Sequence, residues 1–179
     1  MGTAAKALPL EEYLSNPAYE HCEWIDGEAM ELNVGNKSHS TIQGNCSVEL
    51  GLYLRRKRIG YLAIELRCRL RVRDETRIYL PDLAVVLSDQ NPDEIRYLDG
   101  APDLVVEVRS PDEPLSALVR KIQDYLASGA KLAWVILPEE RAVLVFTPNA
   151  PTRTAVSGEI LDGGDLLPDL TIPVDALFA

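Results

Sequence analysis

The sequence predicts a mixed α/β (α+β) fold, with a mixed β-sheet core flanked by helices and with peripheral β-hairpins. Three observations predict it: two segments have helical periodicity, several segments have the two-residue alternation of strands, and short turn motifs join neighbouring strands. The order helix, hairpin, helix, strands, helix, hairpin favours a sheet covered by helices. The 179 residues have the length of one domain and no linker or repeat divides them, so residues 1–179 are expected to form a single domain.

The first third of the chain predicts a short helix, a hairpin and a long helix. Residues 9–16 (PLEEYLSN) begin with proline, which suits the start of a helix. Residues 23–32 predict a hairpin, because the pair Asp26-Gly27 separates two strand-like runs. A helix capped by Asn36 or Ser38 is expected to run to about Arg58. Its apolar stripe has helical spacing and consists of Ile42, Cys46, Leu50, Tyr53 and Leu54.

The middle of the chain predicts strands. Apolar residues alternate with arginines in one segment, where Leu66, Cys68, Leu70 and Val72 are separated by Arg67, Arg69, Arg71 and Arg73. Residues 77–80 and 82–87 predict one strand or two. Residues 103–108 form an apolar run interrupted only by Glu107, and such a run is typical of a central strand covered on both faces.

The last third predicts a helix over residues 116–128, followed by Gly129 as its stop. Its inward residues are expected to be Leu118, Ile122, Tyr125 and Leu126. A hairpin is predicted from strands at residues 132–137 and 142–146, joined by a turn at residues 138–141.

Composition excludes several classes of protein. Hydrophobic residues make up 46% of the chain and charged residues 26%, which is typical of a globular protein. No apolar run approaches the roughly 20 residues that span a bilayer, so no membrane association is expected. The first six residues do not resemble a signal peptide. The three cysteines, Cys22, Cys46 and Cys68, lack the spacing of a zinc site or a disulfide framework. A cytoplasmic protein with reduced cysteines is therefore expected.

The charge is acidic overall but unevenly distributed. The formal net charge of −10 argues against tight non-specific binding to nucleic acid, which depends on Lys and Arg. Residues 55–77, however, hold nine of the 18 basic residues and three acids, so this segment carries +6 and the rest −16. The alternating arginines could follow a phosphate backbone, form a solvated strand face or line a subunit interface, and the solvated face is the commonest of these patterns.

Three acids and one lysine are the candidate chemical groups. Asp82 begins a strand after Pro81, Glu107 lies inside an apolar strand, and Glu23 lies in the first hairpin. A carboxylate in a buried strand is costly unless it is compensated, and a divalent cation is one way to compensate it. Equally, Glu107 could point outward from an edge strand. Lys121 lies on the predicted helix on the same face as Tyr125, where it could stabilise negative charge or cover the helix as a solvated side chain.

Several of these residues form a pattern that resembles a known family. Pro81-Asp82, the run APDLVVEVRSP at residues 101–111, and Lys121 with Tyr125 are similar to the Uma2 (Uma-two) family of restriction-endonuclease-like proteins, which has the PD-(D/E)XK nuclease fold. The segment WIDGE at residues 24–28, His39 and residues 129–134 match as well. Together these motifs are specific, although each one alone is weak. The resemblance extends from about residue 11 to residue 146, and more loosely to the end.

The resemblance implies a restriction-endonuclease-like sheet and hydrolysis of phosphodiester bonds with Mg²⁺ or Mn²⁺. Asp82 and Glu107 would hold the metal, and Glu23 resembles an additional catalytic acid. The usual lysine position, two residues after the second acid, is occupied by Arg109, so the resemblance implies that Lys121 has taken the role of that lysine. The accessory residues would be His39, Glu28 and Tyr125, although a histidine at a helix start is more often solvated. Arg109 and the four alternating arginines (Arg67, Arg69, Arg71 and Arg73) are candidate contacts to nucleic acid.

The leading hypothesis is therefore a metal-dependent endonuclease that acts on nucleic acid, with DNA as the expected partner. Two other hypotheses compete with it. A nuclease-fold protein that no longer cleaves could serve as a homodimeric binding or assembly module, which the acidic charge and Arg109 favour. A hydrolase with paired carboxylates could act on a small phosphorylated or glycosidic substrate, but only 6% of the residues are aromatic, which argues mildly against a sugar site.

Overall fold

The computed structural model describes residues 7–32, 36–87 and 97–179. Its largest sheet has six strands in the order β11-β10-β9-β8-β6-β3. These strands are β3 (Tyr61–Ala63), β6 (Leu83–Val86), β8 (Leu104–Val108), β9 (Leu132–Leu137), β10 (Ala142–Phe146) and β11 (Arg153–Val156). Only β8 and β9 run parallel to each other; the other pairs in this sheet are antiparallel, so the sheet is mixed. The predicted fold class is confirmed.

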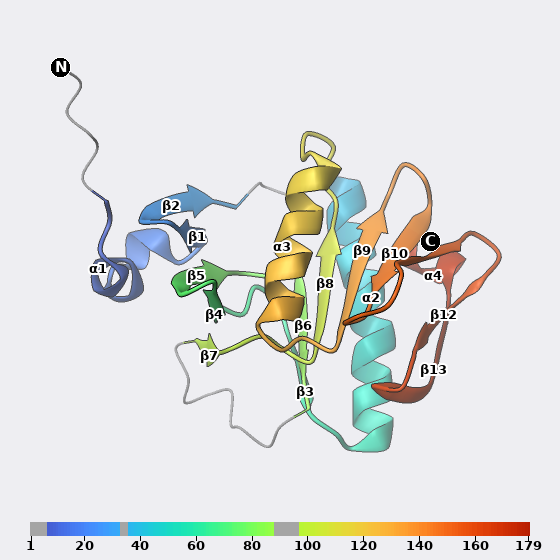
Figure 1. The fold of residues 1–179 in the computed structure, drawn as a ribbon. Helices are drawn as coiled ribbons and strands as arrows, with labels where there is room; N and C mark the ends of the chain where they lie inside the picture. The colour runs from blue at the N-terminus through green and yellow to red at the C-terminus, as the bar shows by residue number, and fades with distance from the viewer. Residues whose placement is uncertain (1–6, 33–35, 88–96) are drawn as a thin grey trace.

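A second sheet packs beside the first and has five strands in the order β2-β1-β5-β4-β7 (Figure 1). Its strands are β1 (Cys22–Ile25), β2 (Glu28–Glu31), β4 (Cys68–Val72), β5 (Glu75–Tyr79) and β7 (Leu98–Asp99). The hairpin β1–β2 turns at Asp26-Gly27, where both residues have positive φ (52° and 84°), as a tight two-residue turn requires. Because β1 pairs with β5, this hairpin joins the sheet, and Glu23 lies on its inner strand β1.

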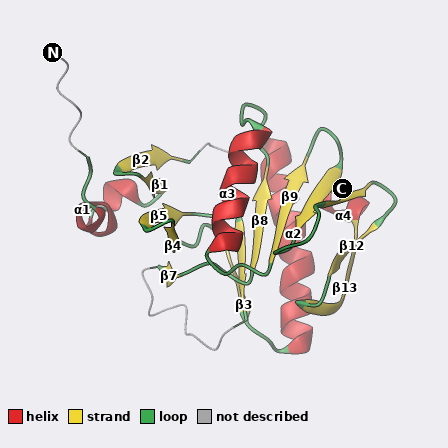
Figure 2. Cartoon of the chain, in the orientation of Figure 1, coloured by secondary structure: helices red, strands yellow, loops and turns green. Residues whose placement is uncertain are grey.

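Helices α2 (Lys37–Lys57) and α3 (Leu115–Ala127) cover opposite faces of the six-stranded sheet (Figure 2). The other helices are α1 (Leu10–Ser15) and the short 3₁₀ helix η1 (Pro17–Tyr19), which lie beside the five-stranded sheet, and α4 (Val174–Leu177). Strands β12 (Ile160–Gly163) and β13 (Leu167–Pro173) form a separate C-terminal hairpin. One apolar cluster joins α2 to alternate residues of β6, β8 and β9, and another joins α3 to the residues between them. The central strands are continuously apolar because both of their faces are covered.

Helix α2 forms as the sequence predicts. The Asn36 side chain caps it by accepting a hydrogen bond of 2.9 Å from the backbone N–H of His39. Its buried residues are those of the predicted apolar stripe: Ile42, Cys46, Leu50, Tyr53 and Leu54. The cap fixes the first turn of α2, from which His39 projects. Among the described residues, no helix is both long enough and apolar enough to cross a membrane.

Candidate active site

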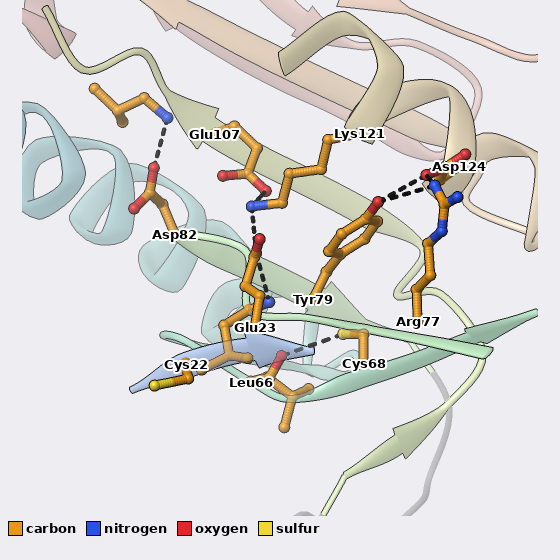
Figure 3. A network of polar contacts seen from close by, with 12 residues as sticks. Cys22, Glu23, Leu66, Cys68, Arg77, Tyr79, Asp82, Glu107, Lys121 and Asp124 are labelled. Carbon is orange, nitrogen blue, oxygen red and sulfur yellow. Dashed lines mark hydrogen bonds and ion pairs between the residues drawn. The ribbon is translucent and has the colours of Figure 1, made fainter. Parts of the chain in front are cut away.

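One open cleft, termed the main cleft, brings together candidate residues from distant parts of the sequence. Glu23 of β1, His39 of α2, Asp82 before β6, Glu107 of β8 and Lys121 of α3 all line it. The cleft has a volume of about 470 Å³, within the range of small-ligand sites. Figure 3 shows the Asp82, Glu107, Lys121 and Glu23 side chains gathered between the two sheets and α3. Four residues predicted to be catalytic therefore meet at one place.

Asp82 lies beside Glu107 because strands β6 and β8 are antiparallel neighbours. Leu83 pairs with Val106, so the preceding residue Asp82 lies across from Glu107. The Asp82 carboxylate accepts a hydrogen bond of 2.6 Å from the Val108 backbone N–H. This bond holds the Asp82 side chain at the end of β8. It uses only one of the two carboxylate oxygens, Oδ2.

His39 points at Asp82 rather than into solvent. Its Nε2 lies 3.3 Å from Oδ2 of Asp82, and its side chain is only 12% exposed. The contact with Asp82 raises the pKa of His39 above its usual value, although burial opposes the shift. The commoner expectation for a histidine at a helix start, a solvated side chain, is therefore wrong here, because the Asn36 cap turns the first turn of α2 toward the strand ends.

Lys121 lies between two carboxylates. Its Nζ is 2.8 Å from Oε1 of Glu107 and 2.7 Å from Oε1 of Glu23. The same Glu23 oxygen accepts a hydrogen bond of 3.1 Å from the Leu80 backbone N–H. Oε1 of Glu107 makes no hydrogen bond of good geometry despite its short distance to the ammonium, so this contact is an ion pair without a well-directed hydrogen bond. Lys121 thus lies between carboxyl groups that come from both sheets.

The two buried partners have shifted pKa values. Glu107 is only 5% exposed and is the one polar or charged residue in the core of the described chain. Burial raises the pKa of Glu107 to about 8, and the neighbouring Lys121 ammonium opposes this rise. Burial alone would lower the pKa of Lys121, but Glu107 and Glu23 more than offset it, so the pKa stays above its ordinary value. The alternative that Glu107 points outward from an edge strand is wrong, since β8 is central.

Tyr125 and Glu28 differ in their relation to the main cleft. Tyr125 is fully buried beside it, where its ring packs on Tyr79 with centroids 5.5 Å apart and its hydroxyl has no hydrogen-bond partner among the described residues. Glu28 begins β2 as an exposed residue and does not line the main cleft. The structure therefore brings Tyr125 next to the site as a packing residue, and it does not bring Glu28 there.

Arg109 points away from the carboxylates. Its Nε donates to the Glu113 backbone carbonyl at 3.2 Å, and its Nη1 lies 3.5 Å from Oε1 of Glu140 in the β9–β10 turn. Arg109 lines a separate pocket with Asn36 and Ser110. The arginine that stands at the usual lysine position is therefore directed elsewhere, and Lys121 occupies the place next to the acids.

The alternating arginines of β4 do not line the main cleft. Cys68, Leu70 and Val72 pack toward α3, so Arg67, Arg69 and Arg71 lie on the opposite face of the five-stranded sheet. Arg67 donates to the Tyr19 carbonyl at 2.8 Å, and Arg69 forms an ion pair of 2.8 Å with Asp99. These contacts favour the hypothesis that Arg67, Arg69 and Arg71 form a solvated strand face over the hypothesis that they bind nucleic acid at the site.

Arg73 leaves this row because β4 ends at Val72. Arg73 and Asp74 both have positive φ (49° and 69°) and form a tight turn. The turn places Arg73 in a second cleft, termed the side cleft, which Arg120 of α3 also lines. The side cleft shares Glu23, Met30, Glu113 and Lys121 with the main cleft. Neither Arg73 nor Arg120 forms an ion pair with another of the described residues.

Gln43 and Glu113 are among the residues of the main cleft that sequence reasoning missed. Gln43 donates a hydrogen bond of 3.0 Å from Nε2 to the Asp82 backbone carbonyl. Its position one helical turn after His39 was the available signal, since residues i and i+4 share a face. Glu113, in the loop before α3, also lines the cleft, and burial raises its pKa. A loop acid carries no periodic signal, so the sequence pattern could not single it out.

The ligand set suits a hard divalent cation. Asp82 and Glu107 offer carboxylate oxygens in one cleft, and Mg²⁺ is commonly bound by one or two carboxylates with water and substrate oxygens completing the shell. Within the part of the chain that the structure describes, no three His, Cys, Asp or Glu side chains come close enough to hold an ion by themselves. A cation here would therefore depend on the two acids plus non-protein ligands, and the exposed cleft leaves room for them.

Comparison with known proteins identifies the family and the fold of the chain. A family model described as "Uma2: Putative restriction endonuclease" matches residues 10–175. A crystal structure described as a putative nuclease belonging to DUF820, from Anabaena variabilis, superposes with a TM-score of 0.82 at 24% sequence identity, covering 94% of this chain and 96% of that one. No curated protein matches the chain significantly. The structural match shows a common fold over nearly the whole length of both chains.

Proposed function

The chain belongs to the Uma2 family, and from this membership we propose that it is a metal-dependent endonuclease that hydrolyses phosphodiester bonds in nucleic acid, DNA in particular. The observation that carries the proposal is the arrangement of Lys121, Glu107 and Asp82 in one open cleft. These are the residue types that phosphodiester hydrolysis needs: two hard oxygen ligands and one cation beside them.

Asp82 and Glu107 would hold Mg²⁺ or Mn²⁺. Such an ion supplies a Lewis acid for the phosphate and lowers the pKa of its bound water. The Val108 backbone N–H and His39 keep Asp82 oriented, while burial keeps Glu107 from solvent. In the reaction, the water oxygen forms a bond to phosphorus as the bond to the leaving oxygen breaks. No covalent intermediate on the protein is required.

Lys121 would stabilise the negative charge that develops on the phosphate. Its ammonium is a compact charge with three donors, and only Glu107 and Glu23 lie within ion-pair distance of it in the described structure. Glu23 would keep Lys121 in place, since one of its oxygens binds both Lys121 and the Leu80 N–H. We therefore assign Glu23 to holding the lysine and Asp82 and Glu107 to holding the metal.

The acidic lining of the main cleft makes the cation essential for binding as well as for cleavage. Six carboxylates line it, from Glu23, Glu31, Glu65, Asp82, Glu107 and Glu113, against Lys121 and two histidines. A polyphosphate approaching this surface without a cation would be repelled. We therefore expect DNA affinity to rise when Mg²⁺ or Mn²⁺ is present.

The test of this proposal is cleavage of a panel of substrates: duplex and single-stranded DNA, and RNA. The protein should cleave at least one of them with Mg²⁺ or Mn²⁺, and EDTA or Asp82→Ala should abolish the cleavage. If a purified, folded wild type cleaves none of them, the alternative of a binding or assembly module becomes the better account. That alternative is favoured by the acidic net charge of −10 and by Arg109, which stands at the usual lysine position but turns toward Glu140. It predicts a homodimer, which the molecular mass in solution would reveal.

A further inference from the structure

A buried polar network connects strand β5 to helix α3 next to Lys121 (Figure 3). Oδ2 of Asp124 accepts two hydrogen bonds of 2.7 Å, one from Nη1 of Arg77 and one from the Tyr79 hydroxyl. The Asp124 side chain is 15% exposed and that of Arg77 is 22% exposed, so solvent weakens this ion pair little. Hydrogen bonds to an ionised carboxylate are short and strongly directional. Nothing in the proposed chemistry uses these three residues.

The network lies beside Lys121. Asp124 follows Lys121 by three residues on α3, so the two side chains share a helix face. Tyr79, which holds Asp124 through its hydroxyl, also places its ring 5.5 Å from the Lys121 ammonium. The next residue, Leu80, donates its N–H to Glu23, the second carboxylate bound by Lys121. The short segment from Arg77 to Leu80, at the end of β5, therefore contacts the lysine, its helix and its partner acid.

From this geometry we propose that Arg77, Tyr79 and Asp124 are positioning residues that set the rotation of α3 and thereby aim Lys121 at Glu107. The apolar contacts of α3, through Leu118, Ile122 and Tyr125, hold the helix on the sheet but are not directional. The α3 N-terminus has no side-chain cap to fix it, since Pro114 stands at that position. The bonds to Asp124 are the directional contacts nearest to the lysine. A rotation of α3 would move the Lys121 backbone relative to Glu107 and Glu23, and the stem would then have to change rotamer to keep the ammonium between them.

The expected loss of cleavage rate rests on the proposed function. The expected displacement of the Lys121 ammonium does not. The variants are Tyr79→Phe, which keeps the ring and removes one hydrogen bond, and Asp124→Asn, which removes the charge of the shortest of the three ion pairs of Arg77, the others being to Glu75 and Asp26. Asp162→Asn is the matched control, because it breaks an exposed ion pair of 2.9 Å with Arg153 far from the cleft. The first readout is the side-chain ammonium signal of Lys121 in ¹⁵N-lysine-labelled protein, which is readily assigned because the chain has five lysines.

The expected result is a shifted or broadened Lys121 signal in both variants and an unchanged signal in Asp162→Asn. In the active enzyme, kcat should fall by about 10- to 100-fold, the effect of displacing a reacting group by roughly 1 Å, while KM changes by less than about twofold. An unchanged Lys121 signal in both folded variants would overturn the proposal, and so would a changed signal with an unchanged kcat. If the wild type cleaves nothing, the proposed function fails, and the Lys121 signal alone decides whether the network positions the lysine.

Discussion

Nζ of Lys121 lies 2.8 Å from Oε1 of Glu107, although the two residues belong to a helix and a strand with a loop between them. The contact places a cation against the most buried acid of the described chain. The lysine beside the acids therefore comes from α3. Arg109, which directly follows β8, turns toward Glu140 instead.

Metal affinity should depend on Asp82. We expect Asp82→Asn to weaken binding of Mn²⁺ by at least about tenfold, because the amide keeps an oxygen for the Val108 N–H but loses the ligand charge. Titration calorimetry with Mn²⁺ measures this directly. Asp162→Asn, an exposed residue in an ion pair with Arg153, is the charge-matched control and should bind like wild type. Equal affinities in all three proteins would remove Asp82 from the metal site.

Stability should depend on pH through Glu107. Because its pKa is raised to about 8 in the folded chain, the folded state keeps a proton that the unfolded state has lost between about pH 4.5 and 8. The stability from this group is therefore fully present below the unfolded pKa and is lost as pH rises through the folded one. Glu107→Gln removes this dependence.

The measurement for Glu107 is urea unfolding of wild type and Glu107→Gln without metal at about pH 5, 6.5 and 8. Relative to the variant, wild type should lose stability as the pH rises. Curves that stay parallel across this range would show that Glu107 is already ionised in the folded protein at low pH, and that Lys121 offsets its burial.

Arginines on the two sides of the five-stranded sheet should contribute differently to the affinity for nucleic acid. We expect Arg73→Gln with Arg120→Gln to weaken binding to all sequences alike, since both arginines line the side cleft that shares Lys121 with the main cleft. The dependence of log K on log salt should become shallower by roughly two, or 0.9 for each lost duplex phosphate contact. Fluorescence anisotropy with a cleavage-resistant duplex in Mg²⁺ gives both quantities.

The matched control for this pair is Arg69→Gln with Arg71→Gln, which removes the same charge from the opposite face of the sheet. Binding and its salt dependence should stay as in wild type, because these side chains point away from both clefts. The reverse outcome, with the Arg69 and Arg71 variant weakened and the other pair unaffected, would place the nucleic acid on the outer face.

Much of this fold could be predicted because its signals are local. The apolar stripe of α2, the Asp26-Gly27 turn and the continuous run of β8 each lie within one segment, and each formed as expected. The arginine row was misjudged at one position for the same reason. Alternation alone continues through Arg73, whereas the chain turns after Val72 so that β4 can pair with β5.

The site could be predicted less completely. Asp82 and Glu107 were visible as acids at strand positions, and the family resemblance selected Lys121. The network of Arg77, Tyr79 and Asp124 could not be found, because Arg77 and Asp124 are 47 residues apart and meet only through tertiary packing. Sequence patterns show which face a residue occupies, but not which distant residue faces it.

The central claim is that Lys121, and not Arg109, serves the metal-bound acids Asp82 and Glu107 in cleavage. The most direct test is the single-turnover cleavage rate of wild type, Lys121→Ala and Arg109→Ala with Mg²⁺ or Mn²⁺, with metal binding measured in the same proteins. We predict that Lys121→Ala still binds metal but cleaves on the order of 100-fold more slowly or worse, the loss expected for one preorganised electrostatic group, while Arg109→Ala loses clearly less. A Lys121→Ala protein that cleaves like wild type beside an inactive Arg109→Ala protein would contradict the account.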